Sequence, residues 1–550
     1  MFVFFFIMGY TKLFSSINLW RVNSGRLFRY CSSVGSTSEC KATAEKRTKN
    51  EAQDTNTEGN KSGLVIGVYE DKDKFELTPV AEEINQRSGG KICGYLNELS
   101  CQLKLGKAFV VTDVVPEFGP VAISSLGKKN PGYNTLEELD ETRENVRVMV
   151  GAGVRALCER GCARVSVCAA GVPDAAAEAA HLAAWRFDEF KSSTDRHQEV
   201  QLSLHGSEGQ EEWDTGVVYG QSQNWARYLT DMPPNKMTPV DFAQTALDTL
   251  CPLGVHVTAH ERSWLEAQRM RGVLAVAAGS CEAPLFLECT WRGADNPPVL
   301  LAADGLTFDC GGLCLRSARD MHGARSVAGA AVVLAVIRTL AILKVPIHVR
   351  AVIPLCEQLV SGHCLKPGDV LPALNGLHMQ VEDTDLESQL LLADALVYGQ
   401  AMYKPSLVID VASLAPVGAS CACACVFTNS EHVCRGARDA GARTGDRLWR
   451  LPLWDYYRRQ VRDDPSVDLR NKGSGTATIC KGAAFLKHFV CGEWLHVDTS
   501  GVRAGGAVYL RAGRAAGRPA RTIAAFLTDA ALADKTDTHT DSHADTPRNS

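Results

Sequence analysis

The fold of this chain is decided by PPVLLAADGLTFDCGGLCL, residues 297–315. An apolar run interrupted at Gly305 predicts a pair of buried strands, and the run ends at Asp309, directly before a Cys-Gly-Gly turn. Apolar runs that end at paired glycines are typical of a buried α/β framework. A lone acid in such a place is as readily a solvated loop residue, so Asp309 becomes a candidate ligand only together with other acids.

A second group of acids lies in NGLHMQVEDTDLESQLLLADAL, residues 375–396. Asp385 and Glu387 are two positions apart, so their side chains point the same way if the backbone is extended. With Asp309 converging from a strand end, they would form an oxygen-rich site that suits Mg, Mn or, less specifically, Zn. The two stretches together therefore predict a metal centre.

Both stretches closely resemble the signature regions of the leucine aminopeptidase (cytosol aminopeptidase) family, whose members are two-metal exopeptidases. Two further segments resemble the family in the same order, NWARYLTDMPPNKMTP at 224–239 and GDRLWRLPLWDYYRRQV at 445–461. The resemblance covers roughly residues 63–528. It implies an α/β fold of two domains, each a mixed sheet flanked by helices, with the two-metal aminopeptidase site in the larger C-terminal domain.

Length and patterning give the domain plan. A chain of 550 residues is too long for one core. From about Gly63 onward, strand patterns alternate with helical ones, which predicts three-layer α/β domains. We expect a flexible linker at 39–62, an N-terminal α/β domain at 63–216, an aminopeptidase-like catalytic domain at 217–533 and a disordered tail at 534–550.

The first 38 residues have the composition of a mitochondrial transit peptide. Residues 1–38 contain no Asp or Glu, but they contain Lys12, arginines, many serines and several apolar residues. A secretory signal is disfavoured because no basic residue precedes the apolar run at 2–8, which is also too short to span a bilayer. We therefore expect a mitochondrial location; the alternatives are a true start at Met8 and a cytoplasmic location.

Composition argues against several kinds of partner. The formal net charge is −5 and there is no large basic block, so nothing indicates nucleic acid. The 20 cysteines are scattered, as in a reduced intracellular protein, and do not suggest a disulfide framework. The apolar helix predicted at 327–343 is shorter than a typical membrane span and contains Arg338, so we expect no membrane span.

The resemblance assigns roles to individual positions. Asp309, Asp385 and Glu387 match three of the family's metal-binding carboxylates. Four other positions differ from the family. Asp304 stands where the family has a metal-binding lysine, and Arg316 stands where it has an electrophilic lysine. Val327 stands where the family has a further metal-binding aspartate, and Gln389 stands where it has a bicarbonate-holding arginine. The substrate-pocket positions are matched by Ala324, Ser413 and Ala415.

These four differences impair the implied chemistry. Val327 has no side-chain lone pair and removes a carboxylate from the second ion, a loss that Asp304 replaces only in part. Arg316 keeps a positive charge on a longer, planar fork, and Gln389 cannot hold an anion by charge. Losing a single oxyanion donor costs about 10²–10³-fold in rate. We expect at most one tightly bound Mn or Zn ion per chain and strongly impaired peptide hydrolysis.

Two hypotheses about function follow. The first is a pseudoenzyme, in which the aminopeptidase fold serves as a structural or binding scaffold. It resembles a subgroup of leucine aminopeptidase-like proteins of insect sperm, which have degraded sites and are associated with the mitochondrial derivatives. The alternative is an active Mn- or Zn-dependent leucyl aminopeptidase with an altered second metal site, acting on peptide substrates. In either case the resemblance implies a homohexamer.

Overall fold

The computed structural model describes residues 61–541, except 72–73, 100–101, 324–326 and 416–421. The transit peptide predicted at 1–38 lies outside the described residues, as does the predicted linker apart from its last two residues. Both assignments stay predictions.

The N-terminal domain is built on a six-stranded mixed sheet with the order β3-β4-β1-β7-β8, in which β2 also pairs with β1. Its strands are β1 (Ser62–Asp71), β2 (Lys74–Leu77), β3 (Ala108–Val115), β4 (Phe118–Ser125), β7 (Arg164–Val167) and β8 (Gln201–Leu204). The central strand β1 runs parallel to β4 and β7. Because both of its faces are covered, β1 reads as a continuous apolar run.

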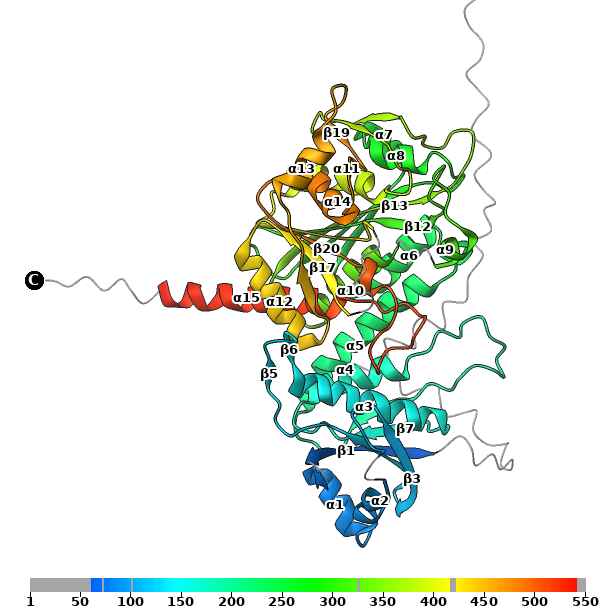
Figure 1. The fold of residues 1–550 in the computed structure, drawn as a ribbon, viewed down its shortest axis with the longest axis vertical. Helices are drawn as coiled ribbons and strands as arrows, with labels where there is room; N and C mark the ends of the chain where they lie inside the picture. The colour runs from blue at the N-terminus through cyan, green and yellow to red at the C-terminus, as the bar shows by residue number, and fades with distance from the viewer. Residues whose placement is uncertain (1–60, 72–73, 100–101, 324–326, 416–421, 542–550) are drawn as a thin grey trace, which may run out of the picture. The chain divides into compact units, whose positions relative to one another are not determined.

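Helices cover both faces of this sheet (Figure 1). On one face α1 (Pro79–Arg87) and α2 (Lys91–Leu99) pack against Leu64 and Ile66. On the other face α3 (Glu141–Glu159) and α4 (Pro173–Ala184) pack against Val65. Alternate side chains of one strand thus supply both cores, which confirms the three-layer arrangement predicted from the sequence. A short hairpin of β5 (Tyr133–Asn134) and β6 (Leu139–Asp140) precedes α3.

The two domains are joined by α5 (Gln210–Asp231), a continuous helix of 22 residues. The boundary expected between residues 216 and 217 therefore falls inside a helix. Gly216 does not break the helix; it allows close packing, since a Cβ there would lie 2.1 Å from the carbonyl oxygen of Asp174 in α4. The helix ends at Asp231, and its C-cap Met232 lies directly before two prolines that cannot continue it.

The C-terminal domain contains a nine-stranded mixed sheet with the order β18-β17-β20-β16-β11-β13-β10-β9, in which β12 also pairs with β13. Its strands are β9 (His256–His260), β10 (Leu285–Arg292), β11 (Val299–Ala303), β12 (Gly305–Asp309), β13 (His348–Gln358), β16 (Leu407–Ala412), β17 (Ala424–Thr428), β18 (Leu448–Arg450) and β20 (Glu493–Asp498). A smaller sheet comprises β14 (Val370–Pro372), β15 (His378–Gln380) and β19 (Leu469–Arg470).

Helices also cover both faces of the large sheet. One core includes α6 (Pro239–Leu250), α10 (Ala328–Ile342), α12 (Glu431–Thr444) and α15 (Ala520–Asp541). The opposite core includes α7 (Arg262–Ala267), α8 (Arg271–Ala277), α11 (Ser388–Tyr403), α13 (Asp455–Arg462) and α14 (Thr478–Leu486). The short helix α9 (Ala318–Gly323) follows the loop after β12. Two mixed α/β domains are thus present, as predicted.

The strand pair predicted around Gly305 is present as β11 and β12. Both strands follow β13 in one register, which places Asp304 opposite Pro354. Proline has no N–H to complete the ladder, so the strand is interrupted at this point. A register shift between Leu306 and Phe308 then redirects the end of β12. As a result, Asp304 lies at the interruption between β11 and β12, and Asp309 lies at the end of β12.

The apolar helix predicted at 327–343 is confirmed as α10, which is buried along nearly its whole length. Its one charged side chain, Arg338, donates a hydrogen bond to Ser222 Oγ of α5 at 2.7 Å. Within the part of the chain that the structure describes, no helix combines the length and the hydropathy needed to cross a bilayer.

The last helix, α15, is longer than the sequence suggests. We predicted a disordered tail from residue 534, but residues 534–541 are helical; residues 542–550 lie outside the described residues. Ile523, Leu527 and Ala531 lie four residues apart and pack into the core of the large domain. Once packing has nucleated a helix, each further residue adds a hydrogen bond at little cost in conformational entropy. The polar residues at the end of α15 can therefore continue the helix.

Asp394 fastens α11 to α8. Its carboxylate is buried, and its Oδ2 accepts hydrogen bonds from the backbone N–H groups of Gly272 at 2.8 Å and Val273 at 3.2 Å. Burial raises the pKa of Asp394 to about 7, although these two hydrogen bonds oppose the shift. The position of α11 matters because the residue directly before this helix is Glu387.

We predict that Asp394→Asn stabilises the protein at alkaline pH. The raised pKa means that the folded state binds this proton more tightly than the unfolded state, so stability falls as pH rises from about 4 to about 7. A neutral amide removes this loss, and its advantage should grow by about 2–3 kcal/mol between pH 5 and pH 8. Urea denaturation at both pH values measures it, with Asp248→Asn, on the exposed side of α6, as the control. An equal effect at both pH values would contradict the prediction.

Candidate metal centre

The structure brings Asp309, Asp385 and Glu387 together, with one oxygen of each within 4.8 Å of the others. Asp309 is the last residue of β12, while the other two precede α11. The extended backbone assumed for the pair of acids is wrong: Asp385 lies in a turn, and Glu387 has helical torsion angles, φ −69° and ψ −28°. A turn leading into a helix, rather than strand alternation, directs both carboxylates to the same place.

Hydrogen bonds hold the loop after β12 against this turn. Thr384 Oγ1 donates to the carbonyl oxygen of Gly311 at 2.6 Å and accepts from the N–H of Cys314 at 2.9 Å. Gln358 Nε2 donates to the carbonyl oxygen of Thr384 at 2.7 Å. Glycine is required at 311 because φ is +81° and a Cβ would lie 2.7 Å from Asp385 Oδ1. The Gly-Gly pair thus allows the two segments to meet.

Burial dominates the electrostatics of the three acids. Burial and the charge of Asp309 raise the pKa of Glu387 well above its ordinary value. Burial also raises the pKa of Asp385, and the guanidinium of Arg316 opposes that shift. Three acids this close cannot all stay charged without a cation among them.

Arg316 supplies a positive charge at this point. Its Nη1 lies 2.6 Å from Oδ2 of the buried Asp309, and its Nε donates to Asp385 Oδ1. The resemblance gives position 316 the role of stabilising an oxyanion. The structure instead directs this guanidinium onto two of the acids, which sequence reasoning did not anticipate.

Asp304 does not belong to the three-acid cluster. It is fully buried, and its Oδ2 accepts a hydrogen bond from Ser388 Oγ at 2.6 Å. Burial raises the pKa of Asp304 to about 7, and the Ser388 hydrogen bond opposes the shift. Val327, at the start of α10, packs into the apolar core of the domain. The side expected to hold a second ion thus offers one apolar side chain and one carboxylate, whose Oδ2 is bonded to Ser388 and whose Oδ1 has no hydrogen-bond partner among the described residues.

Gln389 lies in the first turn of α11 and is buried. Neither atom of its amide has a hydrogen-bond partner among the described residues. A Cβ on Gly482 would lie 3.1 Å from its Nε2, so α14 packs closely against it. Of the predicted substrate-pocket residues, Ser413 and Ala415 follow β16, whereas Ala324 lies outside the described residues. Their roles stay predictions.

Sequence reasoning missed a buried polar group on the neighbouring strands. His496 Nδ1 lies 2.5 Å from Asp410 Oδ1, and Trp494 Nε1 donates to the other oxygen of Asp410. Burial lowers the pKa of His496 and Asp410 raises it, with a net rise. Asp498, two residues further along β20, accepts from the N–H of Leu414 at 2.7 Å. The spacing of His496 and Asp498 in EWLHVD was the available signal, because alternate residues of a strand share a face.

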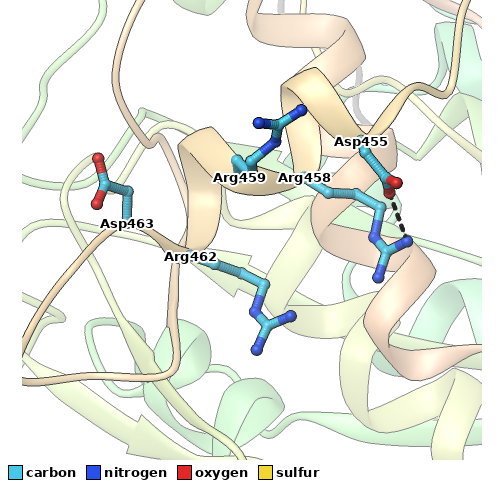
Figure 2. A pocket seen from close by; sticks show the side chains of 5 residues that line it. All are labelled: Asp455, Arg458, Arg459, Arg462 and Asp463. Carbon is cyan, nitrogen blue, oxygen red and sulfur yellow. Dashed lines mark hydrogen bonds and ion pairs between the residues drawn. The ribbon is translucent and has the colours of Figure 1, made fainter.

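A hollow of about 680 Å³ beside α13 is a separate feature. It is lined by Asp455, Arg458, Arg459, Arg462 and Asp463, and by none of the acids described above. Figure 2 shows Arg459 pointing away from Arg458 and Arg462. Arg458 also pairs with Asp455 at 2.7 Å. The three arginines do not point toward one place, so this hollow does not form a binding site for an anion.

Three carboxylates within 4.8 Å have the chemistry that a divalent ion prefers. Two of them are already paired with Arg316, and a second ion would meet Val327 and an Asp304 bonded to Ser388. These residues therefore do not fit a two-ion centre.

Fold and site together define a two-domain mixed α/β protein whose larger domain carries a cluster of three acids. Residues 224–524 match the model of the cytosol aminopeptidase family catalytic domain, and residues 65–194 match that of the family's N-terminal domain. The chain belongs to the cytosol aminopeptidase family, which is metal-dependent.

Curated relatives agree with this assignment, and solved structures share the fold. The cytosol aminopeptidase of Xenopus tropicalis is 38% identical over 483 residues, which cover 85% of this chain and 92% of that protein. The cytosol aminopeptidase of Homo sapiens is 37% identical over 481 residues, covering 84% and 92%. Two structures share the fold: a bottromycin maturation enzyme in complex with Mn (TM-score 0.72, 23% identity, 86% and 100% coverage) and a tomato leucine aminopeptidase mutant (TM-score 0.71, 22%, 86% and 94%).

We predict no more than about one tightly bound divalent ion per chain, because the second-ion side offers only Asp304, half engaged by Ser388, and the apolar Val327. Elemental analysis of purified protein after dialysis against Mn or Zn measures it. Asp304→Asn is the matched variant: it should leave the metal content unchanged, since Asp304 lies outside the acid cluster. Two ions per chain, or a loss of metal in Asp304→Asn, would show that Asp304 is a ligand.

Proposed function

We propose that this member of the cytosol aminopeptidase family hydrolyses peptides poorly or not at all and serves as a structural or binding scaffold. The observation that carries the proposal is the state of the second-ion side. Asp304 is bonded to Ser388 Oγ, and Val327 is part of the apolar core. The second-ion side therefore offers a single carboxylate, of which only Oδ1 has no hydrogen-bond partner among the described residues, and no second acid.

Loss of the second ion has a large chemical consequence. In the two-metal site that the resemblance implies, two ions together activate a water and polarise the scissile carbonyl. The chain's own residues offer little to replace them, because Gln389 is neutral and Arg316 is held by Asp309 and Asp385. Removing one oxyanion donor typically costs about 10²–10³-fold in rate, so the combined changes should reduce hydrolysis further.

The alternative is an active Mn- or Zn-dependent leucyl aminopeptidase with an altered second metal site. Support for it comes from the three acids, which remain within 4.8 Å of one another, and from relatives that are named as aminopeptidases. Its substrates would be peptides with a free N-terminus. Activity of the wild-type chain on a leucine anilide, with added Mn or Zn, distinguishes the two functions.

We further propose a mitochondrial location, on the composition of residues 1–38, with a cytoplasmic location as the alternative. A mitochondrial scaffold with a degraded site resembles the insect sperm subgroup.

We predict that four substitutions restore activity if the rest of the pocket is intact: Asp304→Lys, Arg316→Lys, Val327→Asp and Gln389→Arg. Together they supply the groups that the family has at these positions, so hydrolysis of a leucine anilide should rise at least about 10²-fold above the wild-type chain. Adding Asp385→Asn to the quadruple variant is the control and should abolish the gain. A folded quadruple variant without activity would place the defect elsewhere in the pocket, with Ser413 and Ala415 to be examined next.

We also predict a closed homohexamer that forms without metal. Support comes from large apolar side chains that are exposed on the single chain, including Leu136 at 94%, Trp454 at 65% and Tyr456 at 62%. Sedimentation of chelator-treated protein at micromolar concentration measures the assembly. A monomer under these conditions would contradict the scaffold proposal in this form.

A further inference from the structure

A short closed loop places the Arg316 side chain against Asp309 and Asp385. Its backbone N–H donates to the carbonyl oxygen of Cys310 at 3.0 Å, so the chain returns to the end of β12 within six residues. The side chain crosses Gly311, where a Cβ would lie 3.1 Å from Arg316 Cγ. The loop, its glycine and the arginine side chain thus form one packed unit over Asp309 and Asp385.

The shape of the guanidinium matches this position. Nη1 reaches Asp309 and Nε reaches Asp385, so one planar group bridges two carboxylates on segments far apart in the sequence. A lysine ammonium is a compact point charge without this fork. Charge-assisted hydrogen bonds of this kind are among the strongest in proteins. The Arg316 side chain is also 19% exposed and that of Asp309 is fully buried, so the pair is largely shielded from water.

We propose that Arg316 is a built-in counter-ion that takes the place of a metal ion between Asp309 and Asp385. This inference rests on the proposed function and extends it, because it explains how the acid cluster keeps its shape without metal. An ion entering between these acids must first displace a cation that is covalently part of the chain, and such an internal competitor is present at a high effective concentration. The wild-type chain therefore holds no tightly bound ion at this point, and removing the guanidinium opens the site.

The test compares wild-type protein with Arg316→Ala in Mn titration calorimetry and in thermal unfolding with and without chelator. Wild-type protein should show the same melting temperature in both conditions. Arg316→Ala should bind one Mn per chain at least about tenfold more tightly than the wild-type chain, a difference of about 1.4 kcal/mol. Its melting temperature should fall in chelator and recover when Mn is added.

Arg470→Ala is the matched control. Arg470 pairs with Glu382 at 3.1 Å, and its side chain is 15% exposed, similar to Arg316, but it contacts none of the three acids. This variant should lose stability without any recovery in Mn. A second variant, Arg316→Ala with Asp385→Asn, should lose the Mn binding gained by Arg316→Ala alone, which assigns the binding to this cluster.

The measurements on the wild-type protein test the counter-ion role of Arg316 even if Arg316→Ala fails to fold. One tightly bound Mn in the wild-type chain, or a melting temperature lowered by chelator, overturns the counter-ion role. A folded Arg316→Ala that binds Mn no better than wild type overturns it as well. Failure of the proposed function is a separate result: a wild-type chain that hydrolyses leucine anilide. An inactive wild-type chain that binds one ion would reject only the role of Arg316.

Discussion

Buried carboxylates must be neutralised within the chain, and the arrangement of the site depends on this constraint. An unpaired charge in the interior costs several kcal/mol even after relaxation. Each acid meets the constraint differently: Asp309 pairs with Arg316, Asp304 accepts from Ser388, and Asp410 is bonded to His496. Where pairing is incomplete, burial raises the pKa, as at Asp304. The strands and turns that carry these residues can stay buried because the charges do not remain isolated.

The same constraint joins the two domains. Glu178 of α4 is buried and accepts from Arg147 Nε of α3 at 2.8 Å and from Arg521 Nη1 of α15 at 2.5 Å. Arg147 also donates to the carbonyl oxygen of Arg443 in α12 at 2.7 Å. Breaking a buried pair by removing one partner typically costs about 3–5 kcal/mol. Buried ion pairs, together with the continuous helix α5, therefore link the N-terminal domain to the domain that carries the acids.

Much of the fold could be predicted because apolar periodicity is a local signal. The strands around Gly305, the helix α10 and the two mixed α/β domains all follow from it. The turn at Asp385 could not be read from spacing alone, since i and i+2 acids share a direction in a strand but not in general. The contact of Arg316 with Asp385 joins residues 69 positions apart. No local pattern encodes such a contact; it follows only when the sheet brings the two loops together.

The altered positions differ in how well the rest of the chain accommodates them. Val327 lies in an apolar core where a carboxylate would need a cation, and Asp304 has a hydroxyl donor in Ser388. Arg316 serves two acids at once. Gln389 is the exception, because its buried amide has no partner among the described residues. Because Arg316 pairs with Asp309 and Asp385, the acid cluster no longer needs an ion to stabilise those two carboxylates. Retention of the family's fold is therefore compatible with loss of the family's chemistry.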